Sequence, residues 1–184
     1  MLTKSWDINR FDILTLKSYH LFMKTVLRFL SKKVLAEQIA YAHCDIPCGI
    51  YDPYVAQRAA HTIIRMTQLL SEIKQDDDLK SDHSIARMTH VKEEHSDLLE
   101  EELDTLRNDY FKEEHFKENP SLNDLFGKTL KASAKARQDI DIEAAKEVLA
   151  GVKKIAEIFF KTKGVESIRV KSVYPTGGEI VLHK

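Results

Sequence analysis

The sequence has little of what defines several common protein classes. Its 184 residues include only two cysteines, six glycines and four prolines. Two cysteines are too few for a disulfide-rich secreted scaffold. The formal net charge of -1 gives no reason to expect a nucleic acid as partner. No stretch approaches the roughly 20 consecutive apolar residues of a membrane span. We therefore expect one ordinary globular domain, with no nucleic-acid partner and no membrane span.

The charge is distributed unevenly along the chain. Residues 1–42 carry seven basic and three acidic groups, a net charge of +4, so the remainder carries a net charge of -5. Apolar residues recur at helical spacing over 21–35 with basic residues between them, which predicts an amphipathic helix. The segment ends in Ala40-Tyr41-Ala42, a small-x-small triplet typical of processing sites, but it lacks the apolar run of a secretory signal. We expect 1–42 to be a removable leader of a cytoplasmic protein, and whether it also has a targeting role stays open.

Four amphipathic helices are predicted after the cysteines. The first begins at Asp52-Pro53, the second at Ser81 or Asp82, the third at Asn119-Pro120-Ser121 and the fourth after Asp139 to Asp141. Short links between them favour an antiparallel up-and-down four-helix bundle over residues 53–163. From residue 164 to residue 184 the apolar period changes to two, which predicts a small β-hairpin that extends a subunit interface or covers the end of the bundle. The expected fold class is all-α with this C-terminal hairpin.

The two cysteines lie close together, directly after His43. Thiolates are soft ligands and imidazole is a borderline one, so Cys44, Cys48 and His43 suit a transition metal. A structural zinc site needs a second ligand cluster, which is missing. A thioredoxin-type motif needs two residues between its cysteines, and here there are three. From spacing alone, a metal site, a Cys44–Cys48 disulfide and inert thiols all remain open.

Cleavage after Ala42 would change the chemistry of this segment, because His43 would become the amino terminus. An α-amine has a pKa of about 8, low enough for a metal to displace its proton near neutral pH. His43 would then offer its amine and imidazole, Cys44 its backbone nitrogen and thiolate, and Cys48 a second thiolate. Two nitrogens and two sulfurs in one plane suit a d⁸ ion such as nickel(II), with the imidazole in an axial position.

The segment 43–53, His-Cys-Asp-Ile-Pro-Cys-Gly-Ile-Tyr-Asp-Pro, resembles the metal-binding hook of nickel-containing superoxide dismutases. The resemblance continues in Lys92-Glu93-Glu94-His95, Asn108-Asp109-Tyr110-Phe111-Lys112, His115-Phe116 and Asn119-Pro120, and covers about residues 43–163. It implies that residues 43–52 form the hook and that His43, Cys44 and Cys48 bind one nickel ion per subunit. It also implies a hexamer that converts superoxide to oxygen and hydrogen peroxide once a protease has cut between Ala42 and His43.

The resemblance also implies roles for neighbouring residues. Tyr51 and Asp45 are expected to line the approach path of superoxide, and Pro47 to adopt a cis bond that turns both sulfurs toward one ion. The residues expected to support the hook from the bundle are His95, Tyr110 and Lys112. His95 occupies a position where some relatives have an arginine that, with a glutamate on the first helix, orients the axial imidazole. In this chain the neighbouring positions on the first helix are Ala59, Ala60 and His61.

Two other functions remain as alternatives. The first is a non-catalytic metal-binding or thiol-redox bundle that uses the same hook, and the second is a structural bundle with a Cys44–Cys48 disulfide. A di-iron bundle would need Glu-x-x-His motifs, and no histidine here has a carboxylate three residues before it. Apart from His95, we therefore interpret most histidines of the predicted helices as solvent-facing. Those histidines are His61, His83, His90 and His115.

Overall fold

The computed structural model describes residues 48–74 and 78–184. The elements are α2 (Tyr54–Glu72), α3 (Leu79–Thr105), the π-helical turn η1 (Leu106–Tyr110), α4 (Glu113–Glu118), α5 (Leu122–Gln138), α6 (Ile142–Thr162), β1 (Ser167–Lys171) and β2 (Glu179–His183). The predicted leader and residues 43–47 of the hook lie outside the described part of the chain.

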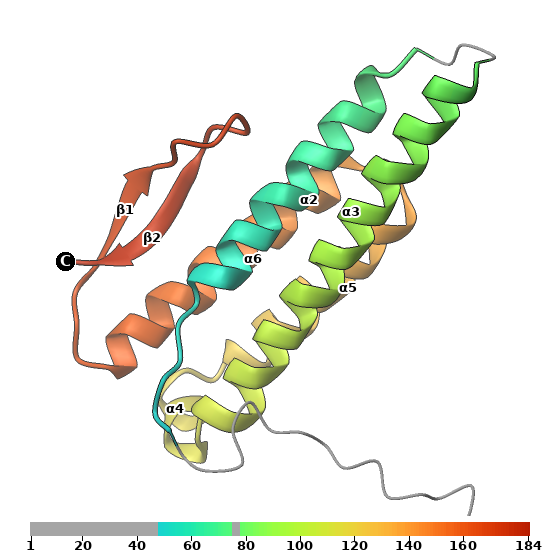
Figure 1. The fold of residues 1–184 in the computed structure, drawn as a ribbon. Helices are drawn as coiled ribbons and strands as arrows, with labels where there is room; N and C mark the ends of the chain where they lie inside the picture. The colour runs from blue at the N-terminus through green and yellow to red at the C-terminus, as the bar shows by residue number, and fades with distance from the viewer. Residues whose placement is uncertain (1–47, 75–77) are drawn as a thin grey trace, which may run out of the picture. The chain divides into compact units, whose positions relative to one another are not determined.

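The four long helices lie side by side and form the predicted bundle (Figure 1). Helix α2 packs against α3 and α6, and α5 packs against α6 and α3. Their facing sides bury a continuous apolar core. Its largest fully buried side chains include Phe126, Ile63, Leu99, Leu103 and Ile155. The predicted all-α bundle with a C-terminal hairpin is therefore confirmed, and none of the described helices is long and apolar enough to cross a membrane.

Two details of the α3–α5 region differ from the sequence prediction. Helix α3 begins at Leu79 rather than at the expected Ser81 or Asp82, because the Asp78 carboxylate accepts a hydrogen bond from the Ser81 backbone N–H at 2.6 Å. At its other end α3 continues into η1, and the short helix α4 follows before α5. Helical periodicity does not distinguish a π-turn from an α-helix, and a helix of six residues is too short to produce a clear period.

Helices α5 and α6 are in tight contact at Gly151. A Cβ atom built at Gly151 would overlap with Oγ1 of Thr129 on the facing helix. The Thr129 hydroxyl donates to the Leu125 carbonyl at 2.8 Å, and its β-branched side chain is buried, so it has little freedom to move away. The absence of a side chain at Gly151 is therefore a packing requirement. At Gly127 in α5, by contrast, a Cβ atom would meet none of the described residues within 4 Å.

We expect Gly151→Ala to lower the free energy of unfolding by about 1–3 kcal/mol, because overpacking a tight contact forces the helices apart. Gly127→Ala is the matched control, and we expect it to be neutral or to raise stability by about 0.5–1 kcal/mol through helix propensity. Urea titration of both variants measures the difference. Equal effects at the two positions would show that the α5–α6 contact is looser than described.

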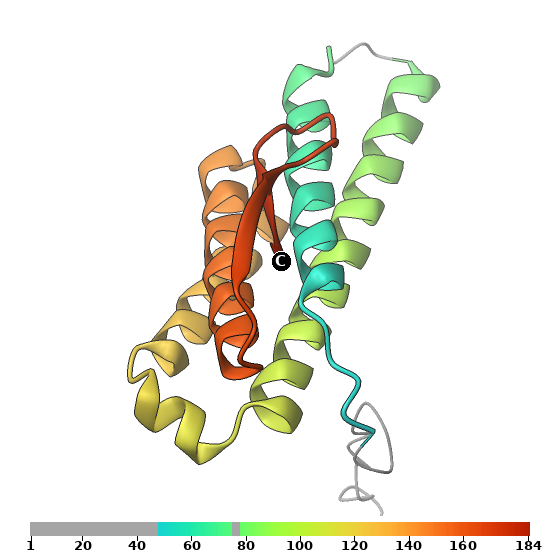
Figure 2. The ribbon, with the colours of Figure 1, turned by 90° about the vertical axis from the view of Figure 1, so that its left-hand side faces the viewer.

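The C-terminal hairpin pairs β1 with β2 in antiparallel register, with Arg169 opposite Val181. Gly177 and Gly178 both have positive φ, 65° and 76°, in the turn that the sequence predicts. The hairpin lies along the side of the bundle made by α2 and α6, rather than over its end (Figure 2). An ion pair from Arg169 to Glu157, 2.6 Å long, contributes to its attachment to α6.

Gln57 attaches the hairpin to α2 through a pair of buried hydrogen bonds. Its Nε2 donates to the Val181 carbonyl at 2.9 Å, and its Oε1 accepts from the Val181 N–H at 2.6 Å. Both residues are fully buried. The side-chain amide therefore satisfies the outer edge of β2 as a neighbouring strand would. Replacing the Gln57 amide by an apolar side chain while the hairpin stays docked would leave the Val181 N–H and carbonyl buried without these partners, and an unsatisfied buried group costs about 1–3 kcal/mol.

His61 is buried beneath the same hairpin, so the interpretation of this histidine as solvent-facing is wrong. It is only 3% exposed. Its Nδ1 shares a hydrogen bond of 2.7 Å with the Thr176 hydroxyl, and its ring meets the Tyr174 ring at a centroid distance of 4.9 Å. Within residues 48–74 and 78–184, its buried Nε2 has no hydrogen-bond partner of good geometry. Sequence periodicity places His61 on α2 but does not show that the hairpin covers it.

The burial of His61 predicts a pH dependence of stability. Burial lowers the pKa of His61, the Glu179 backbone opposes this effect, and the Lys153 charge adds to it. Because the folded pKa lies below the unfolded value of about 6.5, this contribution is present above pH 6.5 and is lost as the pH falls toward the folded pKa. The slope is at most about 1.4 kcal/mol per pH unit for one group.

We expect the free energy of unfolding to fall between pH 7.5 and 5.5 by less in His61→Gln than in the unsubstituted chain. The absolute stability of His61→Gln does not test this assignment, because the variant also loses the hydrogen bond to Thr176. His83→Gln, on the exposed surface of α3, is the control and should keep the full pH dependence. Denaturant titrations at the two pH values measure it, and identical pH profiles for all three proteins would contradict the assignment.

Candidate metal centre and its surroundings

The structure describes five of the residues singled out in the sequence: Cys48, Tyr51, His95, Tyr110 and Lys112. The other five are Ala42, His43, Cys44, Asp45 and Pro47, and they lie outside the described residues. The predicted cis bond at Pro47 and the alternative Cys44–Cys48 disulfide are therefore not tested. The structure describes the carboxyl end of the hook, residues 48–52, and the bundle surface against which it packs.

The chain turns at Cys48 and Gly49 just before it enters α2. Cys48 is half-buried, and its Sγ accepts a hydrogen bond from the Ile50 N–H at 3.4 Å. Gly49 has φ of +72°, a conformation that residues with a side chain rarely adopt. The Asp52 carboxylate then accepts from the Tyr54 N–H at 2.5 Å at the start of α2. A donor to sulfur stabilises its anionic form, which is the form that binds a metal.

Tyr51 connects the hook to the bundle by packing on Tyr110. The two ring centroids lie 5.5 Å apart. Tyr110 in turn contacts Phe111 at 5.0 Å, His115 at 5.7 Å and Phe159 at 4.6 Å. We call these five side chains the aromatic cluster. Its members come from the hook, from the η1–α4 region and from α6, so the cluster gives the carboxyl end of the hook a fixed place on the bundle.

The hydroxyl of Tyr110 has a defined hydrogen-bond direction. It lies 2.7 Å from Thr162 Oγ1, and the Thr162 hydroxyl itself donates to the Phe159 carbonyl at 2.8 Å. A hydroxyl has one proton, so Thr162 must accept from Tyr110. The Tyr110 proton is therefore directed toward the end of α6, while the lone pairs of its oxygen remain able to accept.

Two cations lie around Tyr110. Lys163 places its Nζ 4.8 Å from the centre of the Tyr110 ring, within the range of a cation–π interaction. Lys112 is exposed and donates from its Nζ to the Asp109 carbonyl at 2.6 Å. The backbone N–H of Lys112 donates to His115 Nδ1 at 3.1 Å, so in the neutral ring of His115 the proton is on Nε2.

Sequence reasoning missed the parts played by His115 and Lys163. His115 is half-buried, and its ring stacks on Tyr110 at an interplanar angle of 15° rather than facing solvent alone. The one sequence signal for a role of His115 near the hook is its place in His115-Phe116, a motif that resembles the nickel-containing superoxide dismutases. Lys163 lies in none of the motifs singled out in the sequence. Its contact with Tyr110 joins residues 53 positions apart, which a pattern along the chain does not show.

His95 is not brought to the aromatic cluster within a single chain. It lies on α3, fifteen residues before Tyr110, which at 1.5 Å per residue is about 20 Å along the helix. Its Nδ1 lies 2.9 Å from the Val91 carbonyl, which can only accept, so Nδ1 is the protonated nitrogen. Its Nε2 therefore retains a lone pair when the ring is neutral. The predicted role of His95 beside the hook stays a prediction.

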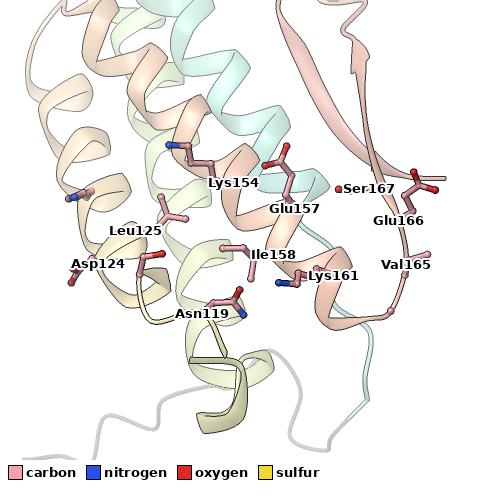
Figure 3. Close-up of a pocket in the computed structure, with 13 residues that line it drawn as sticks. Asn119, Asp124, Leu125, Lys154, Glu157, Ile158, Lys161, Val165, Glu166 and Ser167 are labelled. Carbon is pink, nitrogen blue, oxygen red and sulfur yellow. The ribbon is translucent and has the colours of Figure 1, made fainter. Parts of the chain in front are cut away.

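No three His, Cys, Asp or Glu side chains in the described ranges are grouped so that they could hold a metal ion. A metal at Cys48 with three or more such ligands would therefore need at least one ligand from outside those ranges. A cavity of about 960 Å³ lies elsewhere, between the start of α5, the end of α6 and the segment leading to β1 (Figure 3). It contains none of the predicted site residues, and lysines and carboxylates alternate around it, including Lys154, Glu157 and Lys161.

Comparison with known proteins gives one consistent result. Residues 38–163 match the family model described as nickel-containing superoxide dismutase. Superoxide dismutase [Ni] of Streptomyces seoulensis is 35% identical over 66% of this chain and 88% of its own length. The Streptomyces coelicolor enzyme of the same name is 33% identical over 73% of this chain and 98% of its own length.

The solved structures agree with the sequence comparison. The native structure of a nickel superoxide dismutase is 34% identical, covers 66% of this chain and 99% of its own, and has a TM-score of 0.59. A structure with nickel ligation corresponding to the oxidised state has the same identity and coverage with a TM-score of 0.60. The family match covers more than half of the chain and includes the hook, Tyr51, Tyr110 and Lys112. The chain belongs to the nickel-containing superoxide dismutase family.

Proposed function

We propose that this chain is the precursor of a superoxide dismutase that becomes active when a protease removes residues 1–42. The enzyme converts superoxide to oxygen and hydrogen peroxide with one nickel ion per subunit. The family match over residues 38–163 carries the proposal, since it includes the whole hook. Most of the basic segment 1–42 precedes that match, which supports a leader separate from the enzyme. The non-catalytic metal-binding bundle and the thiol-redox bundle are not favoured, because the matched relatives are named as dismutases.

The donor set fits nickel. We assign the amine and imidazole of His43, the backbone nitrogen and thiolate of Cys44, and the thiolate of Cys48 as ligands. Anionic sulfur and a deprotonated backbone nitrogen stabilise the higher oxidation state of the metal. Nickel bound in this way supplies a one-electron Ni(II)/Ni(III) couple that accepts an electron from one superoxide and returns one to the next. The half-buried Cys48, with an N–H donor on its sulfur, is suited to the thiolate form.

The reduction of superoxide to hydrogen peroxide consumes two protons, which residues beside the hook must pass on. We assign Tyr51 and Asp45 to the approach path. The Tyr110 hydroxyl donates its own proton to Thr162, so Tyr110 acts by holding the Tyr51 ring in place rather than by donating to the reaction. The Tyr51 hydroxyl is then the phenolic group that can deliver a proton at the site.

Local lysines attract the anionic substrate. Residues 43–184 carry a net charge of -5, so the molecule as a whole repels superoxide. Lys163 lies over the Tyr110 ring, and Lys112, two residues after Tyr110, binds the Asp109 carbonyl. Both supply positive charge near the approach path. A local cationic surface raises the association rate of an anion in a salt-dependent way. We assign both lysines to this role.

The proposal includes partners and a location. The hexamer follows from the family resemblance. The exposed apolar side chain of Ile50, 75% accessible within the hook, is compatible with a subunit contact at this place. A maturation protease is required by a ligand set that includes the amine of His43. We place His95 and Pro47 as residues that orient the hook, His95 through its free Nε2. The lack of a secretory apolar run in the leader supports a cytoplasmic enzyme.

The terminal amine is the part of the proposal that distinguishes a nickel dismutase from a thiol-only site. A chain that begins at His43 should bind nickel and dismutate superoxide. One glycine added before His43 should abolish both, because the amine ligand becomes an amide. One glycine added after Lys184 is the matched control and should change neither. Metal analysis and a direct superoxide decay assay measure the two properties.

Cys48→Ser gives a second test of the ligand set, since a hydroxyl does not replace a thiolate for nickel. The variant should retain helical circular dichroism while losing nickel. Full nickel-dependent activity in Cys48→Ser, or in the chain with the added N-terminal glycine, would refute the proposed ligands.

The lysines beside Tyr110 predict a salt-dependent rate. Lys112→Gln and Lys163→Gln should each lower kcat/KM roughly two- to tenfold at low ionic strength, and added salt should reduce the difference. Lys131→Gln, exposed on the distant face of α5, is the control and should have no such effect. Nickel content must be equal in all three variants. A loss of kcat/KM that does not depend on salt, or an equal loss in Lys131→Gln, would show that Lys112 and Lys163 do not attract the substrate electrostatically.

A further inference from the structure

A pocket of about 260 Å³ lies between α2 and the turn that joins β1 to β2. We call it the hairpin pocket. The residues of its wall that matter here are Arg58, His61, Arg65 and Met66 from α2 and Tyr174 and Pro175 from the turn. The turn lies beyond residue 163, where the family match ends, so the pocket depends on a part of the chain outside that match. It is distinct from the hook, which lies before α2.

The walls of the hairpin pocket are fixed by hydrogen bonds between α2 and the turn. The hydroxyls of Tyr54 and Tyr174 lie 2.9 Å apart and share a hydrogen bond. His61 Nδ1 shares a hydrogen bond with the Thr176 hydroxyl at 2.7 Å, and the His61 and Tyr174 rings meet edge to face. These contacts hold the turn against α2 without a ligand. The pocket is therefore preformed, as small-molecule sites usually are.

Two arginines beside the pocket have charges that the described residues do not neutralise. Arg58 and Arg65 are seven residues apart, two helical turns, so they lie on the same face of α2 about 10 Å apart. Across 48–74 and 78–184, neither forms an ion pair, and Arg65 has only a long hydrogen bond of 3.5 Å to Gln68. Arg58 lies near the turn, because it lines the same pocket as Tyr174 and Pro175.

The remaining walls are largely apolar. Met66, the face of Pro175 and the ring of Tyr174 offer carbon surface, and the arginine stems add to it. A fully hydrated inorganic anion would gain little from such walls. An anion with an apolar body would use both the carbon surface and the guanidinium groups. The volume is below the 300–1,000 Å³ that is typical for drug-sized ligands, so the ligand is small.

We propose that the hairpin pocket binds a small carboxylate with an aromatic or branched aliphatic body. The carboxylate lies at Arg58 and Arg65, and the body lies against Met66, Tyr174 and Pro175. Guanidinium groups suit carboxylates because their paired N–H donors match the two oxygens. Such a ligand touches both α2 and the turn, so it binds only the form in which the hairpin is docked and stabilises that form. This inference does not depend on the nickel site.

Benzoate is the probe that tests the proposal, with benzamide as its neutral counterpart of the same shape. We expect saturable binding of benzoate to the full chain, with Kd on the order of 1 mM or tighter, by isothermal titration or NMR titration. Benzamide should bind at least roughly tenfold more weakly, because it is neutral and has one acceptor oxygen where a carboxylate has a negative charge and two. Inorganic phosphate should also bind more weakly, because it lacks an apolar body.

Substitutions place the binding at the pocket. Arg58→Gln and Arg65→Gln should each weaken benzoate binding roughly five- to tenfold, whereas Arg87→Gln on the exposed surface of α3 should leave it unchanged. Backbone resonances of Thr176 and Arg58 should shift on titration. No saturable binding of benzoate, equal binding of benzamide, or an equal effect of Arg87→Gln would each overturn the proposal. The comparison of benzoate with benzamide needs no variant, so it stands even if a substitution disturbs the fold.

Discussion

The packing of Tyr51 on Tyr110 is the contact on which the functional end of this molecule depends. The proposed ligands at His43, Cys44 and Cys48 lie within eight residues of Tyr51 in the sequence. The 5.5 Å ring contact attaches the carboxyl end of that segment to the bundle. Cys48, the one proposed ligand that the structure describes, is therefore three residues from a fixed contact with the bundle.

The aromatic cluster around this contact is itself held by polar groups at the end of α6. Thr162 accepts the Tyr110 proton and donates to the Phe159 carbonyl, so one chain of hydrogen bonds closes the last turn of the helix. Lys163 lies over the Tyr110 ring. Orientation of the Tyr51 ring, which the proposed proton delivery requires, therefore depends on residues more than 100 positions away in the sequence.

The C-terminal hairpin extends this fold in a different way. Its inner residue Val181 is fully buried, and Gln57 and His61 on α2 both direct polar atoms to it or to its turn. Buried polar groups need hydrogen-bond partners. Gln57 and His61 on α2 have theirs only when the hairpin is docked. The family match ends before the hairpin, and the pocket between the turn and α2 is a feature of this added element.

Helical periodicity was enough to predict the four long helices, and the change to period two predicted the hairpin. The π-turn at the end of α3 and the short α4 were not predictable, because neither has a period of its own. Burial of His61 and the contact of Lys163 with Tyr110 depend on tertiary packing and leave no local trace. Family resemblance, rather than spacing, singled out Tyr51 within the hook and Tyr110 as a residue that supports it. The nickel ligands stay a prediction, since two of the three lie outside the described residues.

X-ray absorption of the nickel-loaded protein that begins at His43 tests the central claim most directly. The account predicts one nickel per chain with both nitrogen and sulfur in its coordination shell, and no stoichiometric nickel in the same chain carrying residues 1–42. Stoichiometric nickel with the same spectrum in the longer chain, or a shell without sulfur in the shorter one, would contradict it.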